Sequence, residues 1–198
     1  MATLVSAQET DNSEVFQIGG RAGLTYSNVY DSEGDKFNAD GKLGFTAAAF
    51  FMVPIGKYLG IQPEIMFTQK GFQGSGDLLF SSYQFKRNSY FLEVPLMFAF
   101  KPSEFITILA GPQYSYLLKQ SDRFTSSSTS YLQEQEFKQS SIRNHIFGAA
   151  VGLDINLRHV VLGARIGWDL VNNRSDGNSF TPRYKNVSSQ ITVGYKFY

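Results

Sequence analysis

The alternation of side chains between residues 88 and 100 is the feature that most limits how this chain can fold. The segment reads NSYFLEVPLMFAF. Because successive side chains of a strand point to opposite faces, every second residue from Tyr90 to Phe100 falls on one continuous apolar face. The opposite face carries Glu93 near its centre. A water-soluble sheet would turn Glu93 to solvent, whereas a membrane barrel would turn the apolar face to lipid and Glu93 into a packed polar interior.

Composition favours strands over membrane helices. The 198 residues include 18 Phe, 11 Tyr and 18 Gly but only 6 Pro, a bias that suits strands with close backbone approaches. The longest apolar run, residues 47–55, falls far short of the roughly 18 residues that indicate a transmembrane helix. A mean hydropathy of −0.19 fits a membrane barrel, because alternation keeps the mean low. The net charge of +1 does not favour nucleic acid as a partner, and the absence of cysteine excludes disulfides.

The same alternation recurs along the chain and predicts an all-β fold of eight strands. The predicted strands are residues 15–27, 43–53, 59–70, 88–100, 105–118, 146–157, 160–170 and 189–198. Their connections read long, short, long, short, long, short, long, which is typical of an antiparallel up-and-down transmembrane β-barrel with short periplasmic turns and long extracellular loops. An even strand number with this pattern places both termini in the periplasm. The longest link, residues 119–145, has strand-like flanks and indicates a hairpin that extends beyond the membrane.

We therefore expect residues 15–198 to form one barrel domain. The preceding segment, residues 1–14, includes LVSAQ, which resembles the end of a secretory signal with Val5 and Ala7 at the small-residue positions of a cleavage site. The charged and apolar regions that come before such a site are missing, so a truncated signal and a chance match are the two explanations. We interpret residues 1–14 as a signal-peptide remnant and periplasmic tail.

Four charged residues fall on the predicted interior face near the middle of their strands. They are Arg21, Glu64, Glu93 and Arg165. Two carboxylates and two guanidinium groups sum to zero, so we expect at least one Arg–Glu hydrogen-bonded contact across the barrel. An eight-stranded barrel is just wide enough for side chains to fill; a polar relay or gated conduit is the alternative role. A soluble eight-stranded barrel with a ligand inside is the alternative fold, but charges and glycines on this face suit a solvated exterior poorly.

Several motifs carry a family resemblance. They are Gln62-Pro63-Glu64, Leu92-Glu93-Val94-Pro95, Ala110-Gly111-Pro112-Gln113, Gly163-Ala164-Arg165 and the terminal VGYKFY. In these motifs the chain resembles the PorT-like outer-membrane β-barrel family of Gram-negative bacteria, from about Val15 to its end. Family members typically end on an aromatic residue in a Gly-Tyr-Lys-Phe context, whereas here Tyr198 follows Phe197. The resemblance implies an outer-membrane barrel. It implies no single activity, since a few members are associated with protein secretion and most have no assigned role.

Two further groups of residues suggest chemistry but have simpler interpretations. His145 has Ser140, Ser141 and Glu136 nearby in sequence, but a hydrolase triad converges from separate elements, so a histidine at the barrel rim is the favoured interpretation. His159 falls in a two-residue turn, where we expect it to be solvated.

The first long link carries oxygen ligands of the kind that calcium uses, at Asp31, Glu33, Asp35 and Asp40. Lys36 stands where an EF-hand loop needs glycine, so a solvated acidic loop is favoured. We expect no catalytic residues, no cofactor and no metal site. Aromatic residues are expected to form girdles at the membrane interfaces; the candidates are Tyr90, Tyr114, Tyr116, Trp168, Tyr195 and Tyr198.

These features favour a non-enzymatic outer-membrane protein with a filled lumen. It would act as a structural, accessory or binding subunit through its extracellular loops or its lipid-facing surface. Its expected partners are outer-membrane lipid and lipopolysaccharide, together with other outer-membrane or secretion-system proteins. The alternatives are a small channel or transporter, which needs lumen charges of one sign, and a membrane-embedded lipid-modifying enzyme, which needs His145 to meet a hydroxyl and a carboxylate.

Overall fold

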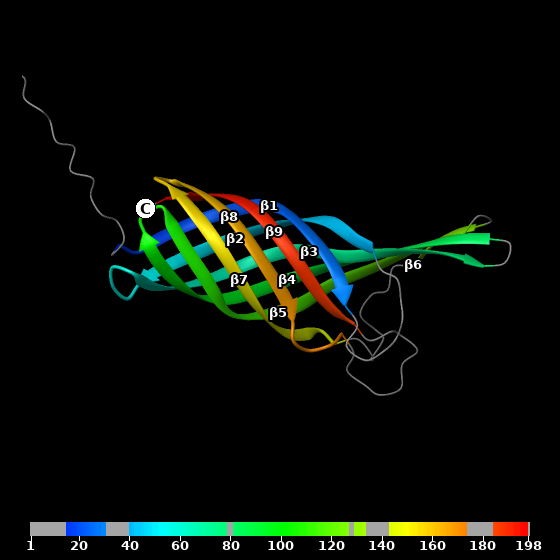
Figure 1. Ribbon diagram of the computed structural model, residues 1–198. Coiled ribbons are helices and arrows are strands. Elements are labelled where there is room, and N and C mark those ends of the chain that lie inside the picture. Colours follow the sequence, from blue (N-terminus) through cyan, green and yellow to red (C-terminus); the bar gives the residue numbers. More distant parts are fainter. Residues whose placement is uncertain are drawn as a thin grey trace, which may run out of the picture.

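The strands of this chain close into a barrel in the computed structural model (Figure 1). The structure describes residues 15–30, 40–78, 81–126, 129–133, 143–173 and 184–197. The strands are β1 (Gln17–Tyr30), β2 (Asp40–Pro54), β3 (Leu59–Leu78), β4 (Ser81–Ser103), β5 (Ile106–Ser126), β6 (Thr129–Gln133), β7 (His145–Leu157), β8 (Val160–Asp169) and β9 (Lys185–Lys196). They pair in the order β4-β3-β2-β1-β9-β8-β7-β5-β6, and a further β4–β5 pairing closes the ring. The described residues include no helix long and apolar enough to cross a bilayer.

The two ends of the barrel differ in their connections. Short turns at residues 55–58, 104–105 and 158–159 join β2 to β3, β4 to β5 and β7 to β8 at one end, which we call the short-turn end. The start of β1 and the end of β9 pair at this end too (Figure 1). Arg158 takes a φ of 53° in the tightest turn, a left-handed conformation that two-residue hairpin turns use. The remaining connections leave from the opposite, long-loop end.

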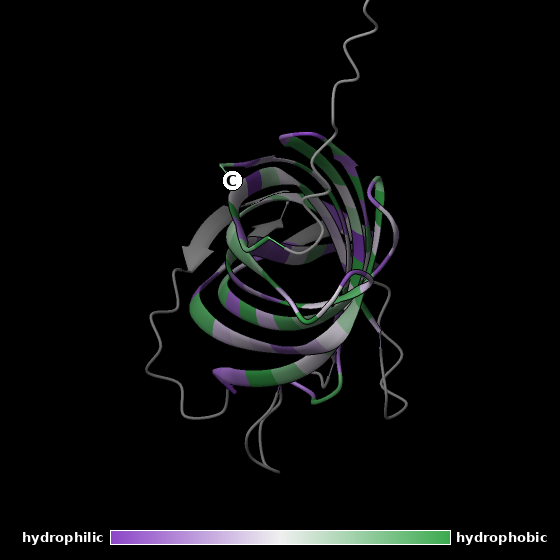
Figure 2. Cartoon of the chain, turned by 90° about the vertical axis from the view of Figure 1, so that its left-hand side faces the viewer, coloured by the Kyte–Doolittle hydropathy of each residue, from purple (hydrophilic) through white to green (hydrophobic). Residues whose placement is uncertain are grey.

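The predicted eight-stranded antiparallel barrel is confirmed, and so is the direction of its faces. Leu92, Val94 and Leu96 are 38%, 41% and 43% exposed, whereas Glu93 and Met97 are 0% exposed. The apolar face of β4 therefore points out of the barrel and the polar face points in. Along the strands, hydrophilic and hydrophobic residues alternate in the view from the short-turn end (Figure 2). The alternative of a soluble barrel with an apolar interior is wrong for this chain.

Three strands run further than the sequence predicts. The segments 71–87 and 119–145 were expected to be links, but β3 continues to Leu78, β4 begins at Ser81 and β5 reaches Ser126. The cause is that the apolar face ends where the strands leave the lipid zone, so the alternation stops although the backbone hydrogen bonds continue. β6 pairs with β5 from Asp122↔Gln133 to Ser126↔Thr129, which confirms the predicted hairpin beyond the barrel. The projecting sheet lies at the right in Figure 1.

Candidate functional site in the barrel interior

Four inward-facing charged residues meet inside the barrel, and we call them the first network. They are Arg21 of β1, Glu64 of β3, Asp154 of β7 and Arg165 of β8. Interior glycines make room for the two long guanidinium side chains. A Cβ at Gly163 would lie 3.1 Å from Arg21 Nη1, and a Cβ at Gly152 would lie 2.9 Å from Arg165 Cγ. The glycines noted in the sequence therefore serve to accommodate side chains in a narrow lumen.

Each arginine of the first network binds a carboxylate through two hydrogen bonds. Arg165 donates to both oxygens of Glu64 at 2.6 Å and 2.6 Å. Arg21 donates to Asp154 at 3.1 Å and 2.8 Å, and its Nη2 lies 3.7 Å from Glu64. Paired forks of this kind are the strongest form of Arg–carboxylate contact. The expected Arg–Glu contact across the barrel is thus present, and the two arginines and two carboxylates sum to zero charge.

Glu93 belongs to a separate group, the second network, and this corrects the expected cluster of Arg21, Glu64, Glu93 and Arg165. Its partner is Lys70, whose Nζ lies 2.6 Å from Glu93 Oε1. The cluster was expected because all four residues fall on the interior face near the middle of their predicted strands. The strand register instead places Met66 opposite Glu93, so Glu64 lies closer to the short-turn end.

Polar side chains complete the second network. Gln113 and Ser115 of β5 donate to Glu93 Oε1 at 2.9 Å and 3.1 Å. Lys70 also lies 3.9 Å from Asp169 of β8, whose Oδ2 accepts a hydrogen bond of 2.6 Å from Asn186. Lys70, Glu93 and Asp169 are all buried. Pairing of this kind offsets the desolvation that would make a lone interior charge costly.

Apolar side chains fill another part of the interior. Met52, Met97 and Leu109 are buried and belong to one cluster, which also includes Ala99 and Ala150. The residues of this cluster are 4% exposed or less. This part of the lumen is therefore packed like a protein core.

A different combination of side chains is buried toward the long-loop end. Phe72 packs edge-on against Tyr184, with ring centroids 5.2 Å apart. Arg87 donates to Tyr184 Oη at 3.0 Å and forms two hydrogen bonds of 2.7 Å and 2.6 Å with Asp122. Phe91 lies nearer the short-turn end than Arg87, in a buried cluster with Leu117 and Ile146. Buried side chains thus occupy the described lumen on the long-loop side of the networks as well as around them.

The other candidate residues lie outside this interior. His145 is exposed; its Nδ1 lies 2.5 Å from Tyr114 Oη, and its ring centroid is 5.1 Å from that of Tyr116. Ser140, Ser141 and Glu136 fall outside the described residues. His159 is exposed in its turn and stacks on Tyr195 at 5.6 Å.

Of the four acidic residues in the first long link, only Asp40, at the start of β2, lies among the described residues, where it is exposed. Asp31, Glu33 and Asp35 are outside the described residues, and so are Tyr198 and residues 1–14. Within the described part of the chain, no three His, Cys, Asp or Glu side chains gather as metal ligands do.

The aromatic girdle candidates divide between the two ends. Tyr90, Tyr114, Tyr116 and Trp168 lie in the half of the barrel nearer the long loops, and Tyr195 lies near the short turns. Tyr90 stacks on Phe67 with ring centroids 6.0 Å apart. Girdles at two membrane interfaces stay a prediction for these residues.

Sequence reasoning left out three charges that complete the two networks: Lys70, Asp154 and Asp169. The alternation of side chains places all three on the inward face, and this alternation was the signal available in the sequence. They were overlooked because Lys70 and Asp169 stand near the ends of the predicted strands 59–70 and 160–170, and Asp154 stands close to the short-turn end of β7.

Comparison with known proteins supports the architecture. A family model described as "Outer membrane protein beta-barrel domain" matches residues 6–175. The comparison with curated proteins found no match.

Solved structures of bacterial outer-membrane proteins share the fold. Ail, the attachment invasion locus protein of Yersinia pestis, is 17% identical with a TM-score of 0.51, over 91% of this chain and 98% of Ail. Neisserial surface protein A is 11% identical with a TM-score of 0.52, over 92% of this chain and 97% of its own. OprG of Pseudomonas aeruginosa is 14% identical with a TM-score of 0.51, over 93% of this chain and 97% of OprG. At these identities the likeness shows the fold alone. On the strength of the family match, the chain belongs to the outer membrane protein beta-barrel domain family and is an integral protein of the outer membrane.

Proposed function

We propose that this chain is a non-conducting, non-enzymatic outer-membrane barrel that acts as a structural, accessory or binding subunit. The observation that carries the proposal is the filled interior. An apolar cluster, two ion-pair networks and the Phe72–Tyr184 contact together occupy the described interior. In an eight-stranded barrel filled in this way, the outer surface and the loops, and not the lumen, are available to bind other molecules.

The orientation is part of the proposal. In bacterial barrels short turns face the periplasm and long loops face outward, so both termini of this chain would be periplasmic. The sheet that β3, β4, β5 and β6 extend beyond the barrel would then project from the cell. Its partners would be lipopolysaccharide and other proteins of the outer membrane or of a secretion system. The length of these strands, 20, 23 and 21 residues for β3, β4 and β5, supports an exposed binding element.

Membership of the PorT-like family is a narrower proposal, and the structure gives its motifs a physical meaning. Glu64, Glu93, Gln113 and Arg165 all come from the motifs that carry the resemblance, and all four take part in the interior networks. The motifs therefore correspond to positions that pack the lumen. For this reason the resemblance supports a shared barrel interior and leaves the partner to be identified.

A channel would need a different interior. Conduction of an ion favours charges of one sign along a continuous path, whereas here arginines and lysine face carboxylates at hydrogen-bonding distance. We therefore rank the channel second. The lipid-modifying enzyme ranks third, because His145 meets the hydroxyl of Tyr114 but, among the described residues, no carboxylate.

Conductance in planar lipid bilayers tests the proposal. Purified, refolded protein should give no stable current steps. Reproducible steps that change when Glu93→Gln is introduced into the lumen, but not when Lys57→Gln is introduced at the short-turn end, would make the channel the better assignment. A pull-down from native membranes in mild detergent then identifies the partners.

A further inference from the structure

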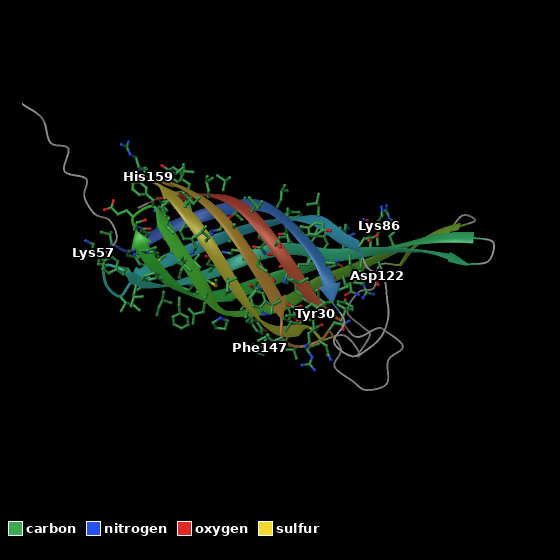
Figure 3. The ribbon with its side chains drawn as sticks, viewed as in Figure 1. Tyr30, Lys57, Lys86, Asp122, Phe147 and His159 are labelled. Carbon is green, nitrogen blue, oxygen red and sulfur yellow. The ribbon has the colours of Figure 1, made fainter. Side chains whose placement is uncertain are left out.

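Two cations stand side by side on the outer surface of the barrel near the long-loop end. Lys86 of β4 lies directly opposite Arg123 of β5 in the strand register, and both side chains are exposed. Their chain neighbours Arg87 and Asp122 also face each other but point inward as an ion pair. Lys86 points away from the barrel wall (Figure 3). Like charges directly opposite in an antiparallel pair are destabilising, so a bound anion would stabilise this arrangement.

A third cation reaches the same area from two strands away. Lys42 of β2 extends across β3 and donates a hydrogen bond to Asn88 Oδ1 on β4. Gly71 of β3 lies in register with Asn88, and a Cβ added there would approach Lys42 Cδ to 3.4 Å. Gln69 donates to the same Asn88 oxygen at 3.2 Å. Because Gly71 has no side chain, Lys42 can extend over it. The hydrogen bond to Asn88 places the ammonium group of Lys42 near Lys86 and Arg123, whose positive charges repel it.

Lys42, Lys86 and Arg123 form a group that we call the cationic patch. Among the described residues, neither Lys86 nor Arg123 has an ion-pair partner. Asp40 is the carboxylate on this face that lies nearest in the strand register, and Gln73 of β3 separates it from Lys86. The patch therefore presents uncompensated positive charge to its surroundings.

The position of the patch selects the kind of anion. Beyond Asn88 and Gln69 toward the short turns, the outward-facing side chains include the stacked pair Tyr90 of β4 and Phe67 of β3. Leu92, opposite Phe67 in the register, is already part of the apolar band. Aromatic side chains of this kind mark the boundary between the acyl chains and the headgroups. The patch therefore stands at headgroup depth on the lipid-facing side, where phosphate groups are the available anions.

We propose that the cationic patch binds the phosphorylated headgroup of a lipid of the outer leaflet, with the phosphates of lipopolysaccharide as the ligand class. Arg123 can bind a phosphate through two parallel hydrogen bonds, and Lys42 and Lys86 act as point charges beside it. This inference rests on the proposed orientation, in which the long-loop end faces the outer leaflet. It goes further in naming the residues and the chemical group that they recognise.

Binding of fluorescent bis-phosphorylated lipid A in dodecyl maltoside micelles tests the patch. The variant Lys86→Gln/Arg123→Gln should bind roughly 10- to 30-fold more weakly than the unaltered protein, since each basic residue near an anionic lipid surface contributes on the order of 1 kcal/mol. The variant Lys57→Gln/Lys185→Gln removes the same charge outside the patch and should change affinity by less than about twofold. Lipid A without phosphates should bind the unaltered protein as weakly as the patch variant binds the phosphorylated lipid.

Three results would overturn the proposal. They are equal binding by the patch variant and the unaltered protein, equal weakening by both double variants, and displacement of lipid A by inorganic phosphate at matching concentration, which would indicate a site for free phosphate. Folding is checked by the gel mobility of unboiled samples. If the patch variant does not fold, salt titration of the unaltered protein decides, because phosphate binding must weaken as salt rises. Failure of the lipid-binding test would not change the expected conductance result, so the proposed function would be judged separately.

Discussion

Arg165 is the residue whose loss should destabilise the interior most. Its two hydrogen bonds to Glu64 are buried, so Arg165→Ala leaves a carboxylate without its main partner inside the barrel. We expect the free energy of unfolding to fall by roughly 3–5 kcal/mol. Urea unfolding in micelles measures this, with the single tryptophan, Trp168, as the fluorescent reporter.

The division into two networks supplies a matched control at the same scale. A double-mutant cycle on Arg165 and Glu64 should give a coupling energy above about 1 kcal/mol, whereas a cycle on Arg165 and Glu93 should give less than about 0.5 kcal/mol. Equal coupling in the two cycles would contradict the separation of the networks and favour the single four-residue cluster that the sequence suggested.

At the scale of elements, the projecting part of the sheet should be separable from the barrel. Gly74 of β3 lies opposite Phe85 of β4, so replacing residues 75–84 by Asn-Gly closes the hairpin without a change of register. We expect the shortened chain to fold, with its unfolding free energy altered by less than about 1 kcal/mol, because changes in loop length cost little.

Deletion of Ile65 alone is the control for that shortening. It removes one residue from the membrane-spanning part of β3, so the residues that follow exchange faces and Lys70 turns toward lipid. This chain should fail to fold. Loss of folding in the shortened hairpin as well would mean that the barrel depends on its projecting sheet.

At the scale of the whole molecule, the closed ring predicts heat-modifiable migration on gels. Each strand of the barrel is hydrogen-bonded on both sides, so the folded form should resist dodecyl sulfate at room temperature and unfold on boiling, as kinetically stable proteins do. Unboiled samples should therefore migrate differently from boiled ones. Identical mobility for the two samples would argue strongly against a closed barrel in solution.

The sequence was sufficient for the fold but only partly for the interior. The alternation around Glu93 predicts the barrel because lipid and lumen impose opposite polarities on neighbouring residues. Parity alone also places Arg21, Glu64 and Arg165 inside. It cannot pair them, because partners such as Arg21 and Asp154 are 133 residues apart and their contact depends on strand tilt and register. The strand-like flanks of residues 119–145 predicted the hairpin of β5 and β6, whereas the extension of β3 and β4 was missed because the outward apolar face ends at the edge of the lipid zone.

Closure of the ring has a consequence for the order of folding events. Gly19 of β1 pairs with Lys196 of β9, so the seam joins residues from opposite ends of the described chain. Contacts with so large a separation in sequence form late, because the entropy of closing the loop must be lost first. Until the seam forms, Arg21 of β1 and Arg165 of β8 belong to separate edges of an open sheet, and their carboxylate partners are distant. We therefore expect insertion and closure to be one concerted transition, in which the charges of the first network become neutral only as the last strand arrives.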